Sequence, residues 1–158
     1  NMIPEVFYNL LKTGYKVKTR AGGNSMFPFI KDNTWIEITP LPRKKIKKGD
    51  VVVFRSNQKI LAHRLIQIDK TNDIYLTRGD FCQKMDNPLS RSEILGKVIK
   101  VHKKYRIVNH LNPVNQLINY IIAQMSYYSV LRVLLLLPQK LSRKLFAIYN
   151  WLFSIHPG

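Results

Sequence analysis

The spacing of apolar residues predicts a short helix followed by a strand. Between residues 4 and 12, apolar side chains recur at helical spacing, and Gly14 follows at the position of a C-cap. From residue 15 to residue 20 the period changes from 3.6 to 2, because apolar and basic residues alternate. This second pattern is typical of a half-buried strand, and it leads directly into the irregular stretch Gly22–Ile30.

Further segments have the patterns of strands, with turn residues such as Gly49-Asp50 and Gly79-Asp80 between them. They are residues 34–39, 51–54, 60–68, 74–77 and 96–102. The run Val-Val-Val-Phe at residues 51–54 is continuously apolar, which predicts a strand buried on both faces. Short strands at a spacing of roughly ten residues, with little helix, indicate a mainly β domain of sandwich or partly closed barrel type.

The C-terminal third has a different pattern. Asn112-Pro113 is a good helix start, and an apolar stripe runs from there to Pro138, followed by a second stripe over residues 140–153. Polar residues and Arg132 interrupt the first stripe, and a charge at the centre of a bilayer costs about 2.5–3.5 kcal/mol. We therefore predict amphipathic helices here and not a membrane-spanning one.

The distribution of charged residues also separates the C-terminal third from the rest of the chain. The sequence has 26 Lys and Arg against 9 Asp and Glu, a net charge of +17, and every acidic residue lies at or before Glu93. We predict a β domain over residues 1–104 and a basic, amphipathic helical tail over residues 105–158. Such a tail, with Trp151 near its end, is typical of helices that lie on an anionic membrane surface. The alternative is that the tail helices pack on the β domain or on another copy of the chain.

Several kinds of function are disfavoured. The basic run at residues 43–48 has no interleaved aromatic residues, so we expect a solvated surface and no nucleic-acid partner. Cys82 is the single cysteine, which rules out an intramolecular disulfide and a cysteine-based metal cluster. No phosphate-binding glycine motif occurs, and we expect neither a cofactor nor a metal. The helical pattern at residues 4–12 is too short and polar for a signal peptide or a membrane anchor.

The stretch GGNSMFPFI holds the candidate nucleophile. Its glycines, Asn24 and Pro28 are typical of a loop that presents one side chain, here Ser25. A serine attacks only when a neighbouring base takes its proton. His63 is the candidate base because it lies inside a predicted strand of the β domain, whereas His102 stands at the end of the last strand and His110 and His156 belong to the tail. A carboxylate would orient that imidazole, and Asp80 and Asp86 are both loop candidates.

The ordered motifs GNSMFPF, KKGDVVVF, AHRLI, YLTRGD with Asp86, and ILGKVIKV resemble the signal peptidase I superfamily of serine endopeptidases. The resemblance spans about residues 21–101. It is strongest to S24/S26-type peptidases with the Ser-His arrangement of endoplasmic-reticulum and archaeal enzymes. It implies that Ser25 is the nucleophile and His63 the base, and it favours Asp86 over Asp80 as the residue that orients His63.

The resemblance also implies how a substrate is bound. Backbone N–H groups around Gly23, Asn24 and Ser25 would hold the oxyanion, and Met26 and Phe27 would help line an apolar groove for an extended peptide. The implied activity is removal of a leader or signal segment from a small peptide or exported protein, by an enzyme peripherally associated with a membrane.

Two departures from the superfamily keep an alternative open. Its usual N-terminal transmembrane anchor has no counterpart in the pattern of residues 4–12, and its acidic motif reads GDFC here in place of GDNN. The alternative is a non-proteolytic module of the same fold that binds peptide or acts as a scaffold at the membrane. A self-cleaving repressor is disfavoured because neither a lysine base nor a DNA-binding domain is evident.

Overall fold

The computed structural model of the chain describes residues 2–41, 45–57 and 59–127. It begins with helix α1 (Met2–Lys12), as the sequence predicts. Gly14 follows in the left-handed region with φ +95°, and its N–H donates to the Leu11 carbonyl at 3.2 Å. A residue with a Cβ rarely adopts this conformation, so Gly14 is what lets the chain turn into the first strand.

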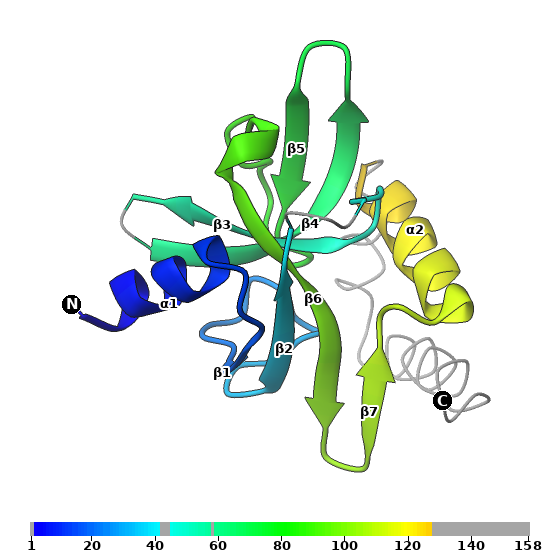
Figure 1. Cartoon of the computed structure of the whole chain (residues 1–158). Coiled ribbons are helices and arrows are strands. Elements are labelled where there is room, and N and C mark those ends of the chain that lie inside the picture. Colours follow the sequence, from blue (N-terminus) through cyan, green and yellow to red (C-terminus); the bar gives the residue numbers. More distant parts are fainter. Residues whose placement is uncertain (1, 42–44, 58, 128–158) are drawn as a thin grey trace.

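The strands of the described residues form one antiparallel, seven-stranded sheet in the order β1-β2-β6-β3-β4-β5, with β7 paired to β6 (Figure 1). Their bounds are β1 Val17–Arg20, β2 Trp35–Pro40, β3 Val51–Ser56, β4 Lys59–Asp69, β5 Ile74–Arg78, β6 Ile94–Lys103 and β7 Arg106–Asn109. The prediction of a mainly β fold with a helix at each end is confirmed. The sheet is not closed into a barrel.

Strand β6 joins the two halves of the sheet. Its residues 96–102 pair with β2, while residues 94–97 pair with β3. Register shifts occur in both pairings, between Glu37 and Ile38 on β2 and between Val53 and Phe54 on β3. Each shift adds a residue on one strand and increases the local twist, so β6 crosses the molecule as the long, bent ribbon seen in Figure 1.

The apolar core has parts on both faces of β3. Val51 and Val53 pack with Leu11, Met26 and residues of β2 and β6. Val52 and Phe54 face the opposite way, among residues such as Leu65 and Tyr75. The predicted burial of this strand on both faces is confirmed, since its first four residues are at most 1% exposed.

Residues after 104 add two elements to this sheet. β7, which the sequence pattern did not predict, pairs with β6. Helix α2 (Pro113–Tyr127) begins at the predicted proline and buries one face, which includes Asn119, Ile122, Ala123 and Ser126. The division of the chain at residue 105 stays a prediction, and the predicted helix beyond Tyr127 lies outside the described residues. No helix in the described part of the chain is long and apolar enough to cross a membrane.

Candidate active site

Ser25 lies in the loop that joins β1 to β2. Backbone hydrogen bonds from Phe29 and Ile30 to the Met26 carbonyl, at 3.0 and 2.9 Å, close a turn directly after it. On the other side, Gly23 has φ +81°, and its N–H donates to Asp32 Oδ1 at 2.7 Å. These contacts fix the loop at both sides of Ser25, which is half-buried.

The loop also packs on the turn that follows β5. The Phe81 N–H donates to the Ser25 carbonyl at 2.9 Å. A Cβ placed on Gly79 would lie 2.7 Å from that carbonyl oxygen and 3.1 Å from the Ser25 Cβ. Gly79 is therefore required by close approach of two backbones, and the Gly79–Phe81 turn sets the position of Ser25.

His63, on β4, is 6% exposed and contacts a carboxylate. Its Nδ1 lies 2.7 Å from Asp86 Oδ2, and the Thr77 hydroxyl donates to the same oxygen at 2.7 Å. The Asp86 N–H donates to the Thr77 carbonyl at 2.9 Å, which holds the carboxylate against β5. Because an ionised carboxylate only accepts, Nδ1 carries the proton and Nε2 has the free lone pair. No described residue forms a hydrogen bond with Nε2.

The segment from Thr77 to Asp86 thus connects the candidate nucleophile and base. Its Gly79–Phe81 turn contacts Ser25, and its two ends, Thr77 and Asp86, hold His63. Within the described residues no hydrogen bond joins Ser25 Oγ to His63. In a serine hydrolase without substrate, that contact is often long and shortens when substrate binds.

Asp80 has a different partner. It accepts two hydrogen bonds from Arg64, from Nε and from a terminal nitrogen, each at 2.7 Å. Both side chains are almost completely buried, at 1% and 0% exposure. Asp80 is therefore held by Arg64, and the carboxylate in contact with His63 is that of Asp86. The sequence pattern did not single out Arg64 or Thr77, although both lie inside the motifs quoted for the resemblance.

A cavity of about 450 Å³ opens beside Ser25. Its lining comes from the ends of β1 and β4, the Ser25 loop, β2, β3 and α1. Met26 belongs to this lining, whereas Asn24 and Phe27 do not. The Phe27 ring instead packs edge-on against Phe81 with centroids 5.7 Å apart, so it braces the loop against the neighbouring turn.

Two strand edges that lack a pairing partner in the described part of the chain border this cavity. Among the residues that the structure describes, β1 pairs with β2 alone, and β4 begins to pair with β5 at Arg64, so residues 59–63 pair with β3 alone. Thr19–Gly23 and Lys59–Ala62 both contribute to the lining. An extended peptide can add to such edges through main-chain hydrogen bonds.

The backbone amides near Ser25 differ in availability. The Gly23 amide is already bonded to Asp32, so it is not free to stabilise an oxyanion. The Ser25 amide has no hydrogen-bond acceptor among the described residues.

Cys82 lies close to the same turn, with Sγ 2.6 Å from the position of a Cβ added to Gly79. Burial, and secondarily the charge of Asp86, raise the pKa of its thiol. Cys82 is therefore protonated at neutral pH and is not a competing nucleophile. The described residues contain no group of three or more His, Cys, Asp or Glu side chains that could hold a metal ion.

Comparison with family models matches residues 8–99 to the model described as Peptidase S24-like. The match covers more than half of the chain and contains Ser25, His63, Asp80 and Asp86. No curated protein matches the sequence.

Proposed function

Because the chain belongs to the Peptidase S24-like family, we propose that it is a serine endopeptidase in which Ser25 is the nucleophile and His63 the general base. The observation that carries this proposal is the pair of His63 Nδ1 and Asp86 Oδ2 at 2.7 Å, which leaves Nε2 unbonded by any described residue. The proposal is supported by the Thr77–Asp86 segment, which contacts both His63 and the half-buried Ser25. An oriented imidazole with a free Nε2 is what activates a serine hydroxyl.

The proposed reaction has two stages. Ser25 Oγ attacks the peptide carbonyl while His63 Nε2 takes the hydroxyl proton, and His63 then gives this proton to the leaving amine. Water hydrolyses the resulting ester with His63 again as base. Asp86 keeps the proton on Nδ1 and stabilises the imidazolium, and the Ser25 amide donates to the oxyanion. In this proposal the chain has the Ser-His arrangement of catalytic residues. Asp80 takes no part in proton transfer and instead neutralises and holds the buried Arg64.

We propose that the substrate is an extended peptide, such as the leader or signal segment of a small peptide or exported protein. It would lie between the free edges of β1 and β4, with side chains on one side entering the apolar cavity lined by Met26. Main-chain pairing would supply affinity, and the cavity would select aliphatic side chains.

The proposal is tested by labelling the purified protein with a fluorophosphonate probe. We expect the wild type to label and the Ser25→Ala and His63→Ala variants not to label, with their folds intact by circular dichroism. Full labelling of Ser25→Ala would refute the assignment of Ser25 as the nucleophile. A wild type that does not label would favour the alternative of a non-proteolytic, peptide-binding or scaffold module.

We also propose that the protein works at an anionic membrane surface. The sequence pattern of the basic tail motivates this proposal, and the β6–β7 hairpin adds to it. Tyr105 and Ile107 are 87% and 57% exposed, and Lys104 lies 5.0 Å from the Tyr105 ring. An exposed aromatic and aliphatic pair beside cations is typical of interfacial segments.

The membrane proposal is tested by flotation with phosphatidylglycerol and phosphatidylcholine vesicles. We expect the wild type to float with the anionic vesicles. A triple variant with Gln at Lys140, Arg143 and Lys144 should float less. Equal flotation of both proteins would reject the tail as the binding segment.

A further inference from the structure

We infer that helix α2, which lies beyond the family match, is part of the catalytic apparatus, and that Asn119 is a positioning residue linking it to the strand of His63. The inference rests on the proposed function. In the described residues α2 contacts the strand that carries His63, the loop that carries Ser25, and the strand that leads to Asp86. Each contact is made by a buried side chain.

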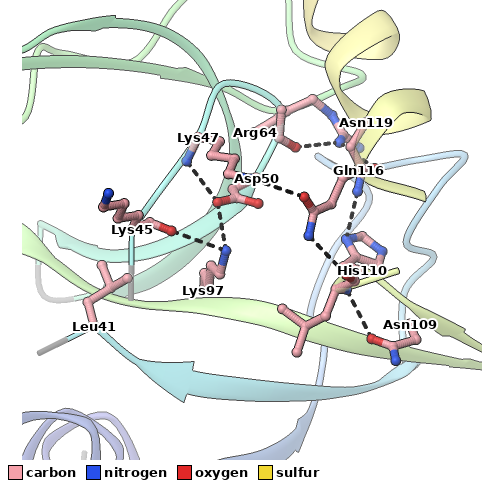
Figure 2. Close-up of polar contacts among 12 residues, drawn as sticks. Leu41, Lys45, Lys47, Asp50, Arg64, Lys97, Asn109, His110, Gln116 and Asn119 are labelled. Atoms are coloured by element: carbon pink, nitrogen blue, oxygen red, sulfur yellow. Dashed lines mark hydrogen bonds and ion pairs between the residues drawn. The ribbon is translucent and has the colours of Figure 1, made fainter. Parts of the chain in front are cut away.

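The first contact is a buried chain of hydrogen bonds from Asn119 through Arg64 to Asp80, which we call the polar relay. Figure 2 shows Asn119 and Arg64. Asn119 Oδ1 accepts a hydrogen bond from Arg64 at 3.0 Å, and the same guanidinium nitrogen donates to the Gly49 carbonyl at 2.9 Å. Nε and the other terminal nitrogen of Arg64 donate to the two oxygens of Asp80. Arg64 follows His63 directly, and Asp80 lies in the turn that contacts Ser25. Asn119 is therefore connected to both halves of the proposed site through one arginine.

The orientation of the Asn119 amide is fixed from its other side. Its Nδ2 lies 3.2 Å from His110 Nδ1, and the backbone N–H of His110 donates to the Ile99 carbonyl at 2.8 Å. Burial, followed by the charge of Arg64, lowers the pKa of His110 to about 3. His110 is thus neutral, and its Nδ1 accepts from Nδ2. This leaves Oδ1 for Arg64.

The backbone of α2 also approaches the β3 side of the sheet as closely as a chain allows. A Cβ on Gly49 would lie 2.6 to 2.7 Å from backbone atoms of Asn119 and Tyr120. Gly49 also has φ +95°, so both the turn and the contact require glycine. The backbone of α2 therefore packs directly against the turn at Gly49, in addition to the contacts that its side chains make.

The second contact reaches the Ser25 loop. Phe29, four residues after Ser25, is buried against Ile122, with Ile118 and Met125 beside it. Its ring also lies 5.5 Å from the Arg64 guanidinium. The turn that follows the proposed nucleophile is thus packed between α2 and the polar relay.

The third contact reaches β5. Arg78 donates to the Ser126 carbonyl in the last turn of α2. Arg78 pairs with Arg64 across the β4–β5 ladder, and it lies between Thr77 and Gly79. Two neighbouring arginines therefore anchor α2 to the strands that hold His63 and the Thr77–Asp86 segment.

None of the α2 residues belongs to the lining found for the cavity beside Ser25. A change at Asn119 should therefore leave peptide binding intact and alter the alignment of Ser25 with His63. Small displacements of reacting groups can cost about a hundredfold in rate. We expect Asn119→Leu, which has a similar volume and no polar atoms, to lower kcat tenfold or more with little change in KM.

The test compares three full-length variants with the wild type. Asn119→Leu removes the relay, Asn119→Asp keeps an oxygen facing Arg64, and Leu117→Gln changes a residue of α2 that is 60% exposed. The readouts are the plateau rate of fluorophosphonate labelling across pH and the thermal unfolding midpoint. We expect slow labelling only for Asn119→Leu, at temperatures where it is folded, with an unchanged midpoint in the pH profile.

Amide hydrogen exchange over residues 23–30 and 77–86 gives a readout that does not depend on activity. We expect both segments to exchange faster in Asn119→Leu and at the wild-type rate in Leu117→Gln. Labelling and exchange at wild-type rates in Asn119→Leu would overturn the inference. If the wild type itself does not label, the proposed function fails, and the exchange result alone decides whether α2 positions these segments. If Asn119→Leu does not fold, Asn119→Ser replaces it in both measurements.

Discussion

Lowering the pH should destabilise this protein through His110. This histidine is buried, and burial with the nearby charges of Arg64, Lys103 and Lys97 lowers its pKa from 6.5 to about 3. The unfolded chain takes up a proton below about pH 6.5, whereas the folded chain does so only near pH 3. The stability of the fold therefore falls as the pH drops through this window.

The size of the effect follows from proton linkage. Each pH unit between the two pKa values costs about 1.4 kcal/mol, and the loss from pH 7 to pH 5 amounts to about 2 kcal/mol. The variant His110→Gln does not titrate, and its amide oxygen can still accept a hydrogen bond from Asn119. We expect its stability to fall by about 2 kcal/mol less than that of the wild type over the same interval.

The assay is urea unfolding at pH 7 and pH 5 at constant ionic strength, with both proteins measured side by side. The comparison cancels the contributions of the other titrating groups, because they are common to both proteins. Equal losses in the wild type and His110→Gln would refute the reasoning, since His110 would then have the same proton affinity in both states.

The remaining predictions concern the proposed site. Asp86→Asn should reduce kcat by about 10³- to 10⁴-fold, measured with a peptide substrate, because an amide no longer fixes the proton on His63 Nδ1. Asp80→Asn should instead act on stability, lowering the free energy of urea unfolding by about 3–5 kcal/mol, since it leaves the Arg64 charge buried without its carboxylate. Gly79→Ala should reduce the fluorophosphonate labelling rate about a hundredfold, because its methyl group displaces the loop of the proposed nucleophile.

Each of these predictions has a control. Asp73→Asn changes an exposed carboxylate, and its remaining oxygen can still accept from the Arg91 N–H, so it should leave kcat unchanged and affect stability far less than Asp80→Asn. Leu117→Gln changes a side chain of α2 that is 60% exposed and lies outside the cavity lining, and it should label normally. The assignment of Asp86 would be wrong if Asp80→Asn, still folded, lost as much activity as Asp86→Asn. A Gly79→Ala protein that labels at the wild-type rate would contradict the packing argument.

Local patterns were sufficient for most of the fold. The alternation of residues 15–20 predicted β1, and the continuous apolar run at residues 51–54 predicted a strand with both faces buried. Proline at residue 113 marked the start of α2. These features depend on side-chain periodicity and on the fixed conformations of glycine and proline, which are properties of the chain itself. β7 was missed because its four residues have no distinctive period.

The candidate site was only partly predictable. Ser25 and His63 could be named because a loop serine and a strand histidine are visible as residue types in order along the chain. The sequence left Asp80 and Asp86 open from the residues alone, and the resemblance favoured Asp86. The sequence could not show that Arg64 forms a buried ion pair with Asp80 or that the Gly23 N–H donates to Asp32. Phe27 was expected in the groove and lies against Phe81.

The amino-acid sequence by itself determined the strands other than β7, the loop of Ser25, and the residues that could take part in proton transfer. The tertiary structure decided that Asp86 is the carboxylate in contact with His63, that the Gly23 amide is bonded to Asp32, and that α2 contacts three segments of the candidate site. The physical reason is the separation along the sequence of the residues that interact. Periodicity and turn chemistry act between residues a few positions apart, whereas the pairs His63–Asp86 and Arg64–Asn119 lie 23 and 55 residues apart. Such pairs form only when the register of β4, β5 and α2 is set by packing of the whole sheet.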